Sequence, residues 1–473
     1  MSDDLIALTA REAVRRLREG DVSPLDLVDA LAARIEAVDG AVNALPIRCF
    51  DRAREQAKRF RSPAKTGPGW LAGLPMIVKD LNEVAGVRTT FGSPIFADYV
   101  PDRNEISVDT LERNGAIPVA KSNTPEFGAG ANTFNEVFGK TRNPWNTALT
   151  CGGSSGGSAV ALATGMAWLA TGSDLAGSLR TPASFCGVVG LRPSPGRVAH
   201  GPGRTPFQTL AVDGPMARNV GDVGLMLDAE CGADVRDPLS FGRPEGSFQA
   251  AAEAPRAPRR VGFSSNLGLG PVDPAIAEIC RAAAQRFAEG GTVVEEACPD
   301  FSGALESFQT LRAELFVGTR ATLLRDHRDL LKPEVIWNIE KGMGQSVGDV
   351  GRAEEIRGEI YHRVVEWFGD YDLLACPTAI TPPFDVDIRY LESLEGHRFD
   401  NYVDWLYIVF AITLTSCPVI SLPVGFTARG LPVGIQLVAR PRGEADLLSF
   451  AAQLEAILSL DWGLPILPRA GSA

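Results

Sequence analysis

The sequence predicts an α/β fold in which one large, mixed and twisted β-sheet carries helices on both faces. From about residue 70, short apolar runs alternate with segments of helical periodicity, as in 74–78, 107–114 and 117–120. Similar alternation returns toward the C-terminus, and no internal repeat separates the two ends. We therefore expect one unit over 1–473, with a helical segment (1–60) packed on a core made of 70–230 and 260–473.

The N-terminal segment predicts two amphipathic helices, at 10–19 and 24–38. Leu27, Leu31 and Ile35 recur every four residues in the second helix. Ser23 can cap it, and we expect Gly40 to end it.

The rest of the chain supplies the core elements. The Gly/Ser-rich region 151–200 includes a buried helix at 159–163, whereas 235–258 is polar and Pro-rich and predicts a surface excursion. We expect strands at 261–264, 293–294, 373–376 and 419–423, and helices at 275–289, 304–330 and 351–368.

Composition argues against nucleic acid and membranes as partners. The chain has 46 Lys+Arg against 58 Asp+Glu, a net charge of -12, and no basic run. The uncharged stretches 151–173 and 407–426 contain glycines or prolines that a membrane span disfavours. The acidic start of the chain lacks a secretory signal, and eight scattered cysteines suggest reduced thiols, so we expect a cytoplasmic protein.

Most common motifs for cofactors and metals fail. None of the four histidines has the spacing of a helical zinc pair, and GKT at 139–141 lacks the earlier glycine of a phosphate loop. The string GSSGG at 153–157 fits the nucleophile elbow of α/β-hydrolases, but a turn-rich segment precedes it where a strand is required. We expect neither metal nor cofactor.

Three polar segments combine residues that could carry chemistry: GLPMIVKD at 73–80, CGGSSGGS at 151–158 and GSDLAGSLR at 172–180. Lys79 ends an apolar run, so burial should lower its pKa and make it a usable base; the alternative is a lysine paired with Asp80. Glycines around Ser154 permit close packing of loops. The turn before Ser178 could direct backbone N–H groups at one point, as an oxyanion hole requires.

Together these segments resemble the amidase signature family. KSNTPEFG at 121–128, RNPW at 142–145, CGVVGLRP at 186–193, DGPMAR at 213–218 and GLPVGIQ at 430–436 also resemble family segments in family order. The resemblance covers nearly the whole chain and is weakest over 235–410. It implies the amidase signature fold and an enzyme that hydrolyses amides.

The resemblance also implies site roles. Ser178 would be the nucleophile, Ser154 the bridging serine after a cis peptide bond, and Lys79 the base; by adjacency alone Ser155 could be the bridge instead. Ser155, Ser173, Asp174 and Arg180 would support the site, the last two by a structural role. The oxyanion hole would use the backbone N–H groups of Leu175, Ala176, Gly177 and Ser178, and substrate would contact Phe127, Gly128, Ala129 and Trp405.

The family contains free-standing amidases and the glutaminase component of tRNA-dependent amidotransferases. The 123–128 segment resembles the free-standing branch, Leu406 stands where the glutaminase component has an acidic residue, and the arginine motif of that component is absent from 320–360. We therefore expect a hydrolase of small, largely uncharged amides. Carbamates, hydrazides and esters remain alternatives, as does a catalytically dead scaffold, and the resemblance leaves room for a homodimer.

Overall fold

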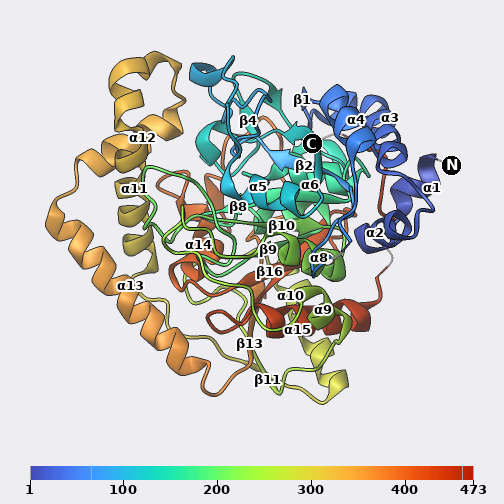
Figure 1. The fold of residues 1–473 in the computed structure, drawn as a ribbon. Helices are drawn as coiled ribbons and strands as arrows, with labels where there is room; N and C mark the ends of the chain where they lie inside the picture. Colours follow the sequence, from blue (N-terminus) through green and yellow to red (C-terminus); the bar gives the residue numbers. More distant parts are fainter. Residues whose placement is uncertain (1, 65, 461, 472–473) are drawn as a thin grey trace.

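The computed structural model describes residues 2–64, 66–460 and 462–471 (Figure 1). Its centre is a sheet of eleven strands in the order β1-β3-β2-β8-β10-β9-β16-β17-β13-β11-β12. The strands are β1 Ile47–Arg48, β2 Pro75–Lys79, β3 Ile117–Ser122, β8 Leu169–Asp174, β9 Val189–Arg192, β10 Val212–Ala217, β11 Arg260–Phe263, β12 Val293–Glu296, β13 Leu373–Pro377, β16 Val419–Phe426 and β17 Pro432–Val438.

The sheet is mixed, as predicted. β2 runs parallel to β3 and β8, and β11 runs parallel to β12 and β13, whereas the middle strands pair antiparallel. Three short hairpins lie outside it: β4 Phe134–Asn135 with β5 Gly139–Lys140, β6 Arg142–Asn143 with β7 Asn146–Thr150, and β14 Ser393–Leu394 with β15 His397–Arg398.

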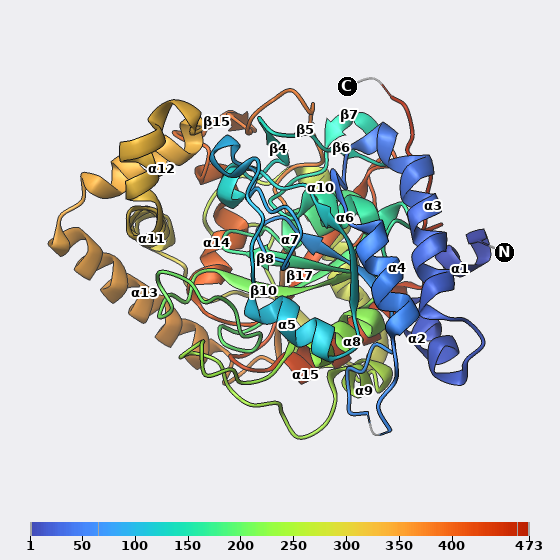
Figure 2. The same ribbon diagram turned by 45° about the horizontal axis from the view of Figure 1, so that its top comes forward.

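Helices cover both faces of the sheet. In Figure 2, α6 and α7 lie on one side of the central strands and α5, α8 and α15 on the other. α11, α12 and α13 lie across the molecule from α1–α4 in both views. The helices are α1 Ser2–Ala7, α2 Ala10–Glu19, α3 Pro24–Val42, α4 Phe50–Arg59, α5 Ile106–Arg113, α6 Gly156–Ala163, α7 Arg180–Cys186, α8 Val220–Glu230, α9 Phe248–Glu253, α10 Pro274–Gln285, α11 Ala304–His327, α12 Pro333–Met343, α13 Val347–Trp367, α14 Tyr407–Leu414 and α15 Glu444–Leu458.

The N-terminal prediction holds with one correction. α2 has the predicted bounds, and Ser23 caps α3 by accepting the backbone N–H of Asp26. Gly40 does not end α3, which continues to Val42 and closes at Asn43 in the left-handed conformation. The Asp39 carboxylate accepts the N–H groups of Ala44 and Leu45, so the helix end is fixed just beyond the glycine.

The predicted surface excursion at 235–258 is partly wrong. Its second half contains α9, capped by Ser247, and α9 buries Phe248 against α8 and α15. Ser247 and the backbone of Phe248 also donate to the buried Asp228 on α8. This anchor outweighs the polar, Pro-rich composition of the segment.

Candidate active site

Lys79 is the last residue of β2, and its side chain is fully buried in the protein interior. Its Nζ donates to the hydroxyl oxygens of Ser154 at 2.7 Å, Ser155 at 2.9 Å and Ser173 at 2.9 Å. Burial lowers the pKa of Lys79 to about 7, although the carboxylates of Asp213 and Asp174 oppose the shift. At neutral pH a large fraction of this amine is therefore uncharged and able to accept a proton.

The alternative expectation, a lysine paired with Asp80, is not what the structure shows. The Asp80 carboxylate pairs with Lys121, whose Nζ lies 2.7 Å away, and it accepts the hydroxyl of Thr90. The pair is buried on both sides. Asp80 therefore leaves Lys79 to the three serines.

Ser154 and Ser155 lie at the entrance to α6, in a loop built from glycines. The peptide bond between Gly153 and Ser154 is cis. A Cβ at Gly156 would lie 2.2 Å from Thr133 Oγ1, and one at Gly157 would lie 2.5 Å from the backbone nitrogen of Asn123. Only glycine fits such close approaches, so the glycines let the loop bring both serines onto Lys79.

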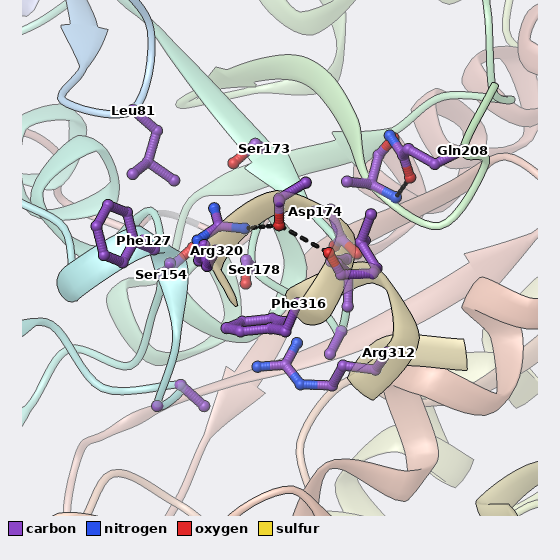
Figure 3. A pocket seen from close by; sticks show the side chains of 18 of the residues that line it. Leu81, Phe127, Ser154, Ser173, Asp174, Ser178, Gln208, Arg312, Phe316 and Arg320 are labelled. Atoms are coloured by element: carbon purple, nitrogen blue, oxygen red, sulfur yellow. Dashed lines mark hydrogen bonds between the residues drawn. The ribbon is translucent and has the colours of Figure 1, made fainter. Parts of the chain in front are cut away.

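Ser178 lies in the turn between β8 and α7, and it lines the same cavity as Ser154 and Ser173. Its carbonyl oxygen accepts the N–H of Ser155 at 3.1 Å, which ties the two serine-bearing loops together. Within the described part of the chain, the Ser178 hydroxyl makes no hydrogen bond, and none joins it to the Ser154 hydroxyl. The hydroxyl is thus unengaged beside the cavity, as Figure 3 illustrates.

The turn before Ser178 requires one correction to the predicted oxyanion hole. The N–H of Gly177 is already used, because it donates to Asp174 Oδ1 at 3.0 Å. The N–H groups of Leu175, Ala176 and Ser178 donate to no other described residue. Three of the four predicted donors are therefore free for an oxygen in the cavity.

Asp174 and Arg180 fix this turn from behind. Arg180 forms a two-pronged pair with the Asp174 carboxylate, with both hydrogen bonds at 3.0 Å, and also donates to Gln436 Oε1 at 2.8 Å. Burial would raise the pKa of Asp174, but Arg180 and then Arg192 lower it below the ordinary range. A carboxylate charged at neutral pH and held by two arginines is suited to positioning the turn.

The cavity beside the serines has a volume of about 210 Å³. Of the predicted substrate contacts, Phe127 and Gly128 line it, whereas Ala129 and Trp405 do not. Phe127 has a φ of 50°, so the chain reverses there and carries Ala129 into the core, where its carbonyl accepts Lys332 Nζ. Trp405 is buried against Phe384, and the next residue, Leu406, lines the cavity in its place.

Sequence reasoning missed the wall that α11 contributes. Arg312, Phe316 and Arg320 line the cavity, and Tyr402 faces them from the loop before α14. These three α11 residues are spaced every four positions within the predicted 304–330 helix, so they fall on one helix face. That spacing, two cations flanking an aromatic ring, was the signal available in the sequence.

A second cavity of about 530 Å³ adjoins the first, since Leu81, Phe127, Ser173 and Arg320 line both. Its wall contains Glu105 and Asp213, which are joined by the side-chain amide of Asn82. Burial and then the nearby Asp213 raise the pKa of Glu105 well above its ordinary value.

Membrane-spanning helices and metal clusters are both missing from residues 2–64, 66–460 and 462–471. No helix in these ranges combines the length and the apolar character needed to cross a membrane. No cluster of three or more His, Cys, Asp or Glu side chains in them is arranged to hold a metal ion.

Known proteins resemble this chain over nearly its whole length. The family model described as Amidase matches residues 26–448. The acylamidase of Rhodococcus erythropolis is 37% identical over 95% of this chain and 95% of its own, and a glutamyl-tRNA(Gln) amidotransferase chain of Moorella thermoacetica is 35% identical over 96% and 97%. The solved structure of a bacterial aryl acylamidase of the amidase signature family superposes with a TM-score of 0.87 at 26% identity, covering 95% of this chain and 96% of that one.

Proposed function

This chain belongs to the amidase family and hydrolyses the C–N bond of carboxylic amides, and we propose that it does so as a serine hydrolase with Ser178 as nucleophile. Lys79 is the base and Ser154 the bridge between them. The observation that carries the proposal is the 2.7 Å hydrogen bond between Lys79 Nζ and Ser154 Oγ, in a buried site where the pKa of Lys79 falls to about 7.

The proton path follows from this arrangement. Neutral Lys79 accepts the Ser154 proton while Ser154 accepts the Ser178 proton, and Ser178 Oγ bonds to the amide carbonyl carbon. The N–H groups of Leu175, Ala176 and Ser178 hold the developing oxyanion, each worth roughly 3–4 kcal/mol when well placed. Lys79 then returns a proton through Ser154 to the leaving nitrogen, and the C–N bond breaks. Water attacks the acyl-enzyme by the same route and regenerates Ser178.

Ser154 is preferred to Ser155 as the bridge for a geometric reason. Both hydroxyls lie within hydrogen-bond distance of Lys79, but Ser154 lines the cavity that Ser178 also lines, and Ser155 does not. The Ser155 hydroxyl is near the backbone carbonyl of Ser173 instead, at 3.3 Å. Ser155 and Ser173 thus hold the amine in place by two further hydrogen bonds.

The substrate is proposed to be a small amide, whose reacting group would lie in the cavity of about 210 Å³ beside the serines. The acylamidase and aryl acylamidase relatives favour aliphatic or aryl amides. Carbamates, hydrazides and esters pass through a similar oxyanion and are alternatives within the same site.

The glutaminase component of a tRNA-dependent amidotransferase is the second candidate, favoured by the 35% identity to the Moorella amidotransferase chain. Leu406, an apolar residue, lines the cavity at the position where that branch is expected to carry an acid for the glutamine amine. Consumption of free glutamine by the purified chain, with a partner protein copurifying, would favour this second function.

The domain organisation, the compartment and the partners of the chain are also proposed. We propose a single catalytic unit over 1–473, working in the cytoplasm on a small molecule, without nucleic acid, membrane or cofactor, and compatible with a homodimer. The eight cysteines are all free thiols, as a reducing compartment favours.

The test is covalent labelling combined with turnover. Wild-type protein should bind one serine-directed phosphonofluoridate per chain, located on Ser178 by peptide mass spectrometry, and lose amide hydrolysis in step. Ser178→Ala should do neither. Labelling at another residue, or turnover retained in Ser178→Ala, would contradict the assignment.

A further inference from the structure

Two arginines of α11 face the cavity beside the candidate catalytic serines. Arg312 and Arg320 both line it, and both guanidinium groups lie over the ring of Phe316, at 4.8 and 5.0 Å from its centroid. Figure 3 shows both arginines among the side chains of the cavity that Ser154 and Ser178 also line.

Neither arginine has an anionic partner among the described residues. Arg312, only 6% exposed, donates to the uncharged Asn338 Oδ1 at 3.2 Å and to the Tyr402 hydroxyl at 2.8 Å, and no described residue accepts a hydrogen bond from its Nη1. Arg320 donates through Nη1 to Thr319, while its buried Nε lacks any partner. No described carboxylate lies within ion-pair distance of either guanidinium.

Two other buried cations of the region have carboxylate partners, in contrast to Arg312 and Arg320. Arg180 pairs with Asp174 and Lys121 with Asp80, so the fold supplies a counter-ion where a cation is structural. Arg320 instead faces a like charge. Burial, and then Arg312, lowers the pKa of Arg320 to about 10, which still leaves it charged at neutral pH.

The groups around Arg320 do not neutralise its charge. Glu126 acts on Arg320 only at long range, and its carboxylate is already engaged by the Ser93 hydroxyl and the backbone N–H of Lys332. The faces of Phe127 and Phe316 offset part of the cost by cation–π contact, at 4.9 and 5.0 Å from Arg320. Asp174 also lines the cavity, but Arg180 and Arg192 already hold its carboxylate. Among the described residues, Arg312 and Arg320 therefore have no ion-pair partner at the cavity wall.

We propose that the cavity takes amides that also carry a carboxylate or an equivalent anion, which Arg320 and Arg312 hold while the amide faces Ser178. This inference rests on the proposed function and names its substrate class. The guanidinium fork suits such a group, because it donates two parallel hydrogen bonds to a carboxylate. Such a substrate differs from the largely uncharged amide that the sequence predicts.

Binding in the Ser178→Ala background tests the inference independently of turnover. The probes are the monoamides malonamate, succinamate, glutaramate and adipamate, each against the neutral amide in which methyl replaces carboxylate. A second pair, N-acetyl-β-alanine against N-propylacetamide, places the charge on the leaving amine. Isothermal titration should give a dissociation constant roughly 10- to 150-fold lower for at least one anionic member of a pair, as expected for a hydrogen-bonded charge.

Arg320→Gln should remove most of that preference while leaving the neutral member's dissociation constant within about twofold. Arg320→Lys keeps the charge without the fork and should fall between the two. Arg325→Gln, an exposed arginine on the same helix, is the matched control and should behave as the parent. Thermal unfolding and binding of the neutral amide report whether each variant is folded.

The inference is overturned if no anionic probe binds more tightly than its neutral partner, or if Arg320→Gln weakens both members equally. Turnover in the Ser178-containing protein separates this from the proposed function. Neutral amides hydrolysed with no anionic preference would reject the anion site alone. Tight anionic binding without hydrolysis of any amide would reject the catalytic proposal alone.

Discussion

The pH dependence of catalysis is the sharpest consequence of the buried lysine. Lys79 must be neutral to accept a proton, so kcat/KM should rise with pH through its pKa of about 7 and level off above it. At pH 7 roughly half of the enzyme carries the neutral amine, whereas at the ordinary pKa only about 1 molecule in 3000 would. At pH 5 activity should be roughly 100-fold below the plateau.

The assay is ammonia release from one good, neutral amide substrate across overlapping buffers from pH 5 to 9.5. Preincubation at each pH and return to pH 8 excludes irreversible inactivation. Lys79→Ala should lower kcat/KM roughly 10²- to 10⁴-fold and remove the titration near pH 7. A flat profile in stable wild-type protein, or an Lys79→Ala variant with full activity, would refute the base assignment.

Burial of the Lys79 amine also lowers the free energy of unfolding, by an amount that depends on pH. Below pH 7 the amine is charged in both states, and the folded state then bears the full penalty of roughly 5 kcal/mol. The penalty shrinks as pH rises from about 7 to the ordinary value of 10.5, where the unfolded chain also becomes neutral. Lys79→Met removes this penalty but also removes the hydrogen bonds to the serines, so it should raise the free energy of unfolding by about 2 kcal/mol at pH 6. The increase should be smaller at pH 9. Urea denaturation at the two pH values measures both.

Four other outcomes are expected. Ser178→Ala should abolish turnover without changing the free energy of unfolding by more than about 1 kcal/mol, read by ammonia release and urea denaturation. Ser154→Ala should lower kcat at least roughly 100-fold and Ser155→Ala by clearly less, and the reverse order would make Ser155 the bridge. Asp174→Asn should lower the free energy of unfolding by about 3–5 kcal/mol, because it leaves two buried arginines without their shared counter-ion. Dialysis against EDTA should leave kcat/KM unchanged, and loss of activity restored by a divalent metal would reinstate a metal site.

The fold could be predicted where the signal is local. The apolar runs that became β2, β13 and β16 were located to within a few residues, and the cap at Ser23 followed from residue type. Strand order could not be predicted, since β9 pairs with β16 although the two lie far apart in the chain, and nothing in either strand names its partner. Gly40 misled because the Asp39 carboxylate fixes the helix end beyond it.

The candidate site shows a similar division. Lys79 is recognisable in the sequence because a charged residue rarely ends an apolar run. The two serine loops are recognisable because glycines cluster beside Ser154 and Ser178. Their convergence on one amine needed the sheet, which aligns the ends of β2 and β8. The cavity wall was less predictable, because Phe127 and Gly128 are both left-handed, and this turn leaves them at the cavity while Ala129 lies in the core.

Desolvation lowers the pKa of both kinds of cation in this site, but it leaves them in different charge states. Lys79 is fully buried and its pKa falls to about 7, so it exchanges protons at working pH, whereas the partly exposed Arg320 falls only to a pKa of about 10 and remains a cation. The site thus contains both a proton acceptor and a fixed positive charge. An arginine in place of Lys79 would keep its proton at working pH and could not act as the base.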